Sequence, residues 1–362
     1  MSLGAARVPG QATPQPTRPR TPEAVTGVTP GRTTGTRDAG TASDPSFTII
    51  ELRADAPGPT IAFVAGVHGG KRAAVAALDR AAGWLPGALQ RGRVLLVPAA
   101  HEAALASGLA QRSPVDSLNL NRVFPGRADG RPTERLAHTL MVSIVAESDY
   151  LVDLHGSDGE ERVGRFAYAA HPGLDPAVDT AALALARAWG APRVVWDADG
   201  PRQLADARFL QTAAHLAGVP AITVFEAGST AEDSAATAAF ERGVRRVLAH
   251  HGMLGPGSAA TGVTATGVAD TEAADGAAVA GPAGPMVVHA RRTVSTAPAT
   301  GRWVPAVAPE AAVRAGELLG TFIGSSGART AVRAPQAGVV LHVRRTLAVS
   351  AGTTLAILAD RP

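Results

Sequence analysis

Residues 60–72 read TIAFVAGVHGGKR, and this stretch decides the fold. A short apolar run, Thr60 to Val64, passes through a glycine-rich turn into an alanine- and leucine-rich segment with helical spacing, 72–84. A buried strand that leads directly into a helix is the repeating unit of α/β proteins. The turn carries His68 and Lys71, so the first candidate functional side chains lie where a strand ends.

The same alternation of short apolar runs and helical segments continues to residue 254. Apolar runs bounded by turn residues predict buried strands, and longer periodic segments predict helices. We therefore predict an α/β fold with a mixed central sheet flanked by helices. The other predicted strands are 47–52, 94–98, 150–154, 193–196 and 221–225, and the other predicted helices are 132–147 and 175–189.

Composition divides the chain into four segments. Residues 1–46 contain almost no large apolar side chain, which predicts a disordered tail. Residues 47–254 form the predicted α/β domain, and residues 255–285, rich in Gly, Ala and Thr, predict a linker or long loop. Residues 286–362 hold short alternating runs punctuated by glycine, which predict a small all-β barrel or sandwich.

Composition also excludes several functions. Without cysteine the chain forms no disulfide, thiolate metal site or cysteine nucleophile. Basic residues are scattered and aromatic residues make up only 4%, so we expect no nucleic-acid partner. The amino terminus has no apolar signal region, and no run of apolar residues is long enough to span a membrane. We expect a cytoplasmic protein with a small-molecule substrate and no membrane partner, and a homo-oligomer stays open.

Polar residues lie at or near several predicted strand ends: His68, His155, Glu226 and the pair Asn121-Arg122. Because ligands of open α/β folds bind at the carboxyl ends of strands, we expect these side chains to converge on one crevice. Two imidazoles and a carboxylate are typical zinc ligands, a further carboxylate can take a proton from water, and an arginine can bind a substrate carboxylate or carbonyl. The set favours a metal-assisted hydrolase.

Four segments in this order resemble the succinylglutamate desuccinylase/aspartoacylase family, a branch of the zinc carboxypeptidase superfamily. The similarity runs from about Ile61 to Leu254, and the carboxyl-terminal segments 334–341 and 349–356 resemble the family's β domain. The most specific segment is Asn-Arg-Val-Phe-Pro-Gly. The four segments are AGVHG (65–69), NLNRVFPG (119–126), DLH (153–155) and EAG (226–228).

The resemblance implies a carboxypeptidase-like fold, and cleavage of amide bonds in N-acyl amino acids and related small molecules. By this similarity His68 and His155 match two of three zinc ligands. Asn121 and Arg122 match the pair that binds the substrate carboxylate or polarises its carbonyl. Glu226 matches the general base that activates water.

The third zinc ligand implied by the resemblance is a glutamate three residues after the first histidine, where this chain has Lys71. Lys71 is the one lysine among 34 basic residues. A protonated amine has no lone pair for a metal, and two imidazoles should hold zinc far more weakly than three ligands do. Zinc is thus the cofactor that the family implies and that Lys71 argues against.

Two further positions depart from the family pattern. Phe225 lies between the usual strand and its terminal Glu226. Because side chains alternate across a strand, one added residue would turn Glu226 away from the crevice unless a bulge absorbs it. Asn119 stands where an aspartate often precedes the Asn-Arg pair, which removes a charged partner for a ligand histidine.

Three hypotheses follow for Lys71. The leading one is a hydrolase of a small N-acyl amino acid or acylated amine whose metal site has departed, or whose zinc uses a substitute carboxylate such as Glu102 or Asp158. The second is a metal-free enzyme acting on a small carbonyl or amide substrate, in which Lys71 stabilises an oxyanion or serves as base or nucleophile. The third is a catalytically inactive, ligand-binding pseudoenzyme.

Overall fold

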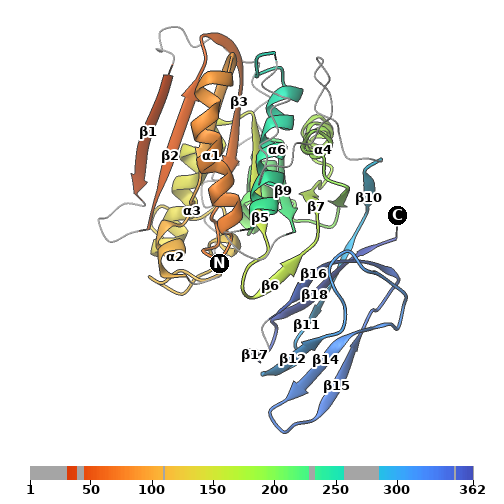
Figure 1. The fold of residues 1–362 in the computed structure, drawn as a ribbon. Coiled ribbons are helices and arrows are strands. Elements are labelled where there is room, and N and C mark those ends of the chain that lie inside the picture. Colours follow the sequence, from red (N-terminus) through yellow and green to blue (C-terminus); the bar gives the residue numbers. More distant parts are fainter. Residues whose placement is uncertain are drawn as a thin grey trace, which may run out of the picture.

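The computed structural model describes residues 31–38, 45–108, 111–227, 233–256, 285–345 and 348–361. Figure 1 shows a large sheet with helices on both faces, and a smaller β domain beyond one end of it. Within the described ranges the large sheet has nine strands in the order β1-β2-β4-β3-β5-β9-β7-β8-β10. The predicted fold class, a mixed central sheet flanked by helices with a small carboxyl-terminal β domain, is confirmed.

The strands of the large sheet include every predicted one and add three more. These strands are β1 (Gly31–Asp38), β2 (Ser46–Arg53), β3 (Ala56–Val64), β4 (Arg91–Val97), β5 (Tyr150–Gly156), β7 (Phe166–Ala170), β8 (Arg193–Asp197), β9 (Ala221–Glu226) and β10 (Val287–His289).

The helices include the three predicted ones. The second ends at Ser143, four residues earlier than expected, and a separate 3₁₀ turn follows it. No helix among the described residues is long and apolar enough to cross a membrane. The helices are α1 (Arg72–Ala88), α2 (Glu102–Ser107), α3 (Pro132–Ser143), α4 (Pro176–Trp189), α5 (Leu210–Leu216) and α6 (Ser234–His250), with 3₁₀ turns η1 (Leu120–Arg122), η2 (Val145–Glu147) and η3 (Leu204–Asp206).

Alternate side chains of the central strands pack against different helices. Ile61 and Phe63 of β3 face the layer that contains α1, α4 and α6, whereas Ala62 and Val64 face the layer that contains α3 and α5. Strands β3, β4, β5 and β9 run parallel, so their carboxyl ends meet at one edge of the sheet. Residues that follow these strands are therefore brought together.

Two predicted boundaries are wrong. Residues 31–38, which we expected in a disordered tail, form β1 and pair with β2 along eight residues. An edge strand can be held by backbone hydrogen bonds without large apolar side chains, and composition alone does not register this. Residues 287–289, which we expected in the β domain, pair with β8 of the large sheet. The predicted tail at 1–30 and 39–44, and the linker from 257 to 284, lie outside the described residues.

In the described carboxyl-terminal residues two sheets pack around a core that contains Trp303 and Phe322. Strand β6 (Glu161–Val163) comes from the first domain and pairs with β16, which joins the two domains. The other strands are β11 (Arg292–Thr296), β12 (Gly301–Pro305), β13 (Ala312–Val313), β14 (Leu318–Gly324), β15 (Arg329–Arg333), β16 (Gly338–Arg344), β17 (Ala348–Val349) and β18 (Thr354–Asp360).

Candidate active site

A pocket of about 860 Å³ lies at the carboxyl ends of the central strands and is lined by both domains. The structure brings four of the six predicted site residues to this pocket. Lys71 and Glu226 do not line it. The lining residues include His68, Asn119, Asn121, Arg122, His155, Glu160, Glu161, Phe209 and Phe225 from the first domain, and Arg292, His342 and Arg344 from the second.

His68 and His155 stand edge to face with their ring centroids 5.3 Å apart. His68 Nε2 lies 3.0 Å from Asn119 Oδ1, and the same oxygen accepts the backbone N–H of Asn121 at 2.9 Å. This oxygen can only accept, so Nε2 of His68 carries the proton. His155 Nε2 likewise donates to the Asp153 carboxylate at 3.1 Å. In both rings Nε2 is thus engaged, and Nδ1 is the nitrogen left to contact a ligand.

His68 is held as a neutral imidazole. Burial lowers its pKa well below the ordinary value, and the nearby charges of His155 and Lys71 lower it further. Nδ1 of His68 is buried and has no hydrogen-bond partner among the described residues. An unpartnered buried lone pair is costly unless the site has a use for it.

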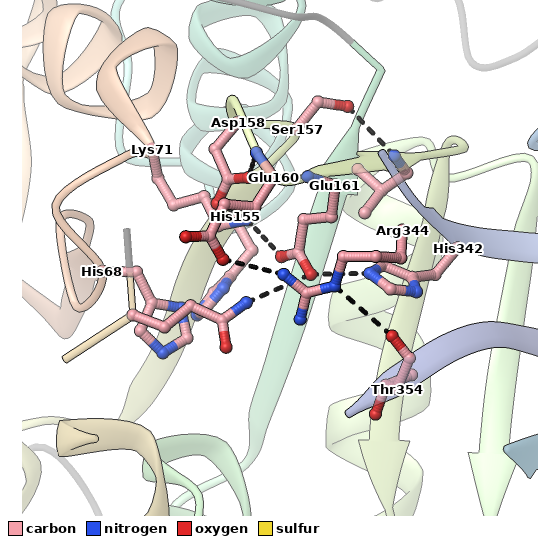
Figure 2. A network of polar contacts seen from close by, with 12 residues as sticks. His68, Lys71, His155, Ser157, Asp158, Glu160, Glu161, His342, Arg344 and Thr354 are labelled. Carbon is pink, nitrogen blue, oxygen red and sulfur yellow. Dashed lines mark hydrogen bonds and ion pairs between the residues drawn. The ribbon is translucent and has the colours of Figure 1, made fainter. Parts of the chain in front are cut away.

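Lys71 directly precedes α1, and its ammonium is enclosed by carboxylates (Figure 2). Its Nζ lies 2.9 Å from Asp158 Oδ2 and 2.5 Å from Glu161 Oε1. Gly70 permits this approach, because a Cβ at that position would lie 2.8 Å from the Cβ of Asp158. Burial opposes the charge of Lys71, but Glu161 and then Asp158 outweigh it and raise its pKa above the ordinary value. Lys71 is therefore an ammonium ion at neutral pH.

The second oxygen of Glu161 extends the network into the carboxyl-terminal domain. Oε2 accepts from Nε2 of His342 on β16 at 2.6 Å and from Nε2 of Gln111 at 3.3 Å. Beside this contact Arg344 Nη1 lies 2.7 Å from Glu160 Oε2. Burial opposes ionisation of Glu161, yet Lys71 and His342 hold the pKa of its carboxyl well below the usual range.

Glu226 is turned to the opposite face of the sheet from the histidines. Its carboxylate accepts from Arg165 Nε at 3.0 Å and from Nε1 of Trp189 on α4 at 3.3 Å. Strand β9 pairs with β5 in unbroken register as far as Glu226, so no bulge absorbs the added residue and Phe225 lines the pocket instead. The expected convergence holds for His68 and His155 but not for Glu226.

Asn121 and Arg122 both line the pocket but are bound differently. Asn121 Oδ1 accepts the first backbone N–H of α5 at 3.0 Å, which fixes that helix. The Arg122 guanidinium donates to the Asn121 carbonyl at 2.6 Å and lies 4.9 Å from the Phe209 ring centroid. Within the described residues it forms no ion pair with a carboxylate. Burial lowers its pKa, as do the charges of Arg208 and Arg292.

The described residues do not fit a zinc site with three protein ligands. The two imidazoles could each offer Nδ1, but the residue three positions after His68 is Lys71, whose ammonium has no lone pair for a metal. Neither substitute carboxylate serves, because Asp158 is paired with Lys71 and Glu102 accepts from two hydroxyl groups of β2. In the part of the chain that the structure describes, no group of three or more His, Asp or Glu side chains is arranged to hold a metal ion.

Sequence reasoning missed that Asp158 and Glu161 pair with Lys71, and that His342 and Arg344 of the second domain extend this network. A buried lysine requires acidic partners. The acidic residues closest after the second histidine, 158–161, were the available signal. His342 and Arg344 gave none, because their place in the pocket depends on how β16 pairs with β6.

Comparisons with known proteins show which family the chain resembles. The sequence profile of the succinylglutamate desuccinylase/aspartoacylase catalytic domain matches residues 57–251. The N-alpha-acetyl-L-2,4-diaminobutyric acid deacetylase of Halomonas elongata is 32% identical over 199 residues, which cover 54% of this chain and 56% of the relative. The match thus spans about half the length of that relative.

Solved structures share the fold over almost the whole chain. A succinylglutamate desuccinylase/aspartoacylase from Rhodobacter sphaeroides superposes with a TM-score of 0.70 at 24% identity, covering 92% of this chain and 96% of the other. The product-bound ectoine utilization protein of Ruegeria pomeroyi gives a TM-score of 0.70 at 23% identity, covering 91% and 93%. With the profile match across more than half of its length, this chain belongs to the succinylglutamate desuccinylase/aspartoacylase family.

Proposed function

We propose that this protein is an amide-bond hydrolase that removes the acyl group from a small N-acyl amino acid or acylated amine. The observation that carries the proposal is the guanidinium of Arg122, which lines the pocket beside two imidazoles and has no carboxylate partner among the described residues. A planar guanidinium binds a carboxylate through two parallel hydrogen bonds. A substrate carboxylate would complete this arrangement.

Family membership supports the reaction class, and the relative from Halomonas elongata is named as a deacetylase of an N-acetyl amino acid. The pocket supports a small substrate with one anionic end. Arg292 adds a second guanidinium, 4.4 Å from the Tyr168 ring centroid, although it is already 3.6 Å from Asp197. Phe225 contributes an apolar surface near His155, with ring centroids 5.5 Å apart.

In the proposed reaction Arg122 binds the substrate carboxylate and so brings the amide carbonyl to the two histidines. Water forms the new C–O bond, the C–N bond breaks, and the proton of the water ends on the departing amine. We assign the proton transfer to the histidine pair rather than to Glu226. His68 is neutral with a lone pair on Nδ1, whereas Glu226 is bound on the other face of the sheet.

A ligand-binding protein without turnover is the second candidate. Its support is that Lys71 stands at the third ligand position and that Glu226 does not reach the pocket. A Lys71-dependent enzyme has less support. Two carboxylates raise the pKa of Lys71, which disfavours the neutral amine that an imine or a proton abstraction requires. The same two carboxylates also offset the positive charge with which Lys71 could stabilise an oxyanion.

The binding step is tested by calorimetric titration with N-acetyl amino acids and with the corresponding carboxamides. We expect the carboxylates to bind more tightly, and Arg122→Gln to weaken their binding by about 10- to 100-fold, because a hydrogen bond to a charged group contributes about 1.5–3 kcal/mol. The matched control is Arg127→Gln, an exposed arginine five residues away that is paired with Asp129. Equal effects of the two substitutions would exclude Arg122 as the carboxylate ligand.

The chemical step is tested by measuring amine release from a panel of N-acyl amino acids, with and without a chelator. Release that persists with the chelator supports a hydrolase that works without a metal. Release only after zinc is added keeps the hydrolase but contradicts our assignment of the ligand set. Tight binding without release across the panel supports the binding protein and rules out the hydrolase.

A further inference from the structure

The two oxygens of the Glu161 carboxylate bind residues of different domains (Figure 2). Oε1 contacts Nζ of Lys71 at 2.5 Å, and Oε2 accepts from Nε2 of His342 at 2.6 Å. The three side chains are largely shielded from water, with exposed fractions of 1% for Lys71, 13% for Glu161 and 7% for His342. Contacts between charged groups persist in such surroundings because water neither screens nor replaces them.

Lys71 holds both β6 and the turn before it, through the carboxylates of Glu161 and Asp158. Oδ2 of Asp158 faces its ammonium, while Oδ1 of the same residue accepts the backbone N–H groups of Glu160 and Glu161 at 2.8 and 2.9 Å. A single ammonium thereby fixes both a side chain of β6 and the turn that leads into it.

The backbone connection between the domains at this point is short. Strand β6 has three residues, and its ladder with β16 pairs 161 with 344, 162 with 343 and 163 with 342. The segment that follows β16, 348–354, lines the pocket together with Arg344. The position of β16 therefore determines where the carboxyl-terminal wall of the pocket stands.

We propose that Lys71 is a positioning residue that, through Glu161 and His342, fixes the carboxyl-terminal domain against the pocket. An internal cation at the position of a metal ligand thus serves to set the shape of the pocket. The proposal holds whether the pocket hydrolyses its ligand or only binds it. Arginine would not substitute, because the site encloses a compact ammonium with 2% exposure and a guanidinium is larger and planar.

The chain lacks cysteine, so two introduced cysteines report the distance between the domains without background labelling. We choose Val142→Cys on α3, which is 51% exposed, and Ser325→Cys in the exposed turn between β14 and β15. The distance between nitroxide labels on this pair is measured by pulsed electron paramagnetic resonance. In the parent pair we expect one narrow distance distribution.

The test substitution is His342→Asn, and the matched control is His215→Asn. His215 is equally buried, 6% against 5%, and its Nε2 contacts Asp179 at 2.7 Å, but both residues lie within the first domain. We expect His342→Asn to broaden or split the distance distribution and to weaken binding of pocket ligands, while His215→Asn leaves both unchanged. A narrow parent-like distribution in His342→Asn would overturn the proposal.

A second variant tests the role of the ammonium itself without leaving buried charges unpaired. Lys71→Met combined with Asp158→Asn and Glu161→Gln replaces the ionic contacts by neutral groups of similar size. We expect it to broaden the same distance distribution, because the ionic contacts that hold β6 to the residue before α1 are gone while β6 stays paired with β16. If this variant keeps the narrow distribution, Lys71 does not position the domain, whatever His342→Asn shows.

Discussion

Strands β5 and β9 lie side by side and run parallel, yet their carboxyl ends present different chemistry to the pocket. On β5 His155 faces the pocket, with the buried carboxylate of Asp153 two residues before it. On β9 Thr223 and Phe225 line the pocket, and the carboxylate of Glu226 projects to the other face. One residue of register places Phe225 in the pocket and the carboxylate of Glu226 against Trp189.

The comparison gives the two strand ends separate roles. Near β3 and β5 two imidazoles line the pocket, and Lys71 is buried nearby without lining it. At β9 Glu226 pairs with Arg165 and Trp189 and serves the packing of α4. Substitutions at the two strand ends should therefore change different measured properties, and not only differ in the magnitude of one effect.

The largest expected effect is on stability, from Lys71→Met. This substitution leaves Asp158 and Glu161 as buried carboxylates without their cation, and breaking a buried pair in this way costs about 3–5 kcal/mol. Urea unfolding monitored by circular dichroism measures the free energy of unfolding. The triple variant with Asp158→Asn and Glu161→Gln should recover most of the loss, and a loss below about 1 kcal/mol in Lys71→Met would show that the cluster is not buried in solution.

The next largest effect concerns turnover and separates the two strand ends directly. If amine release is observed, we expect His68→Asn to lower kcat by about 100-fold or more, because positioned proton transfer contributes about that much. Glu226→Gln should leave kcat and ligand affinity near the parent values. The reverse outcome, a large loss only in Glu226→Gln, would mean that β9 shifts its register when substrate binds.

Glu226→Gln should instead affect stability, by about 1–2 kcal/mol, because it weakens a buried hydrogen-bonded contact with Arg165 and Trp189. Thermal and urea unfolding both report this change. The matched comparison is Glu51→Gln on β2, which removes the carboxylate partner of Arg93 and Arg53 far from the pocket. A stability loss with unchanged ligand binding supports a packing role for Glu226.

The smallest effects are in pH dependence, where the two glutamates should have opposite signs. Lys71 and His342 hold the pKa of Glu161 below its ordinary 4.5, so its contribution is full above that pH and is lost as the pH falls. Burial raises the pKa of Glu226, so the pH-dependent part of its contribution is present below pH 4.5 and is lost as the pH rises through the raised value. The stability difference between parent and variant, measured at several pH values, should therefore shrink toward acid for Glu161→Gln and grow toward acid for Glu226→Gln.

Local patterns in the sequence predicted six strands of the large sheet, three of its helices and four of the residues that line the pocket. The predicted strand at 60–64, the helix that follows it and the Asn-Arg motif lie where expected. Glu226 was expected in the crevice if a bulge absorbed Phe225, and β9 has no bulge against β5. Composition failed for β1, because an edge strand needs backbone pairing rather than apolar side chains.

The contact that carries the Lys71 network into the second domain could not be predicted, for a physical reason. Glu161 and His342 are 181 residues apart and meet only because β6 leaves the first domain to pair with β16. No local periodicity encodes that docking. Lys71 itself was visible as the single lysine, but whether it was a free amine, a fixed charge or an anchored ion depends on two carboxylates placed by tertiary structure.

The most direct test of the account is a calorimetric titration of zinc into chelator-treated wild-type protein. We expect no tight one-to-one binding, because Lys71, three residues after His68, is an ammonium whose pKa is raised by Glu161 and Asp158 against the effect of burial. The positive control is Lys71→Glu combined with Asp158→Asn and Glu161→Gln, which should gain one zinc per chain. Tight stoichiometric binding by the wild-type protein would contradict the claim that an internal cation has taken the place of a metal ligand.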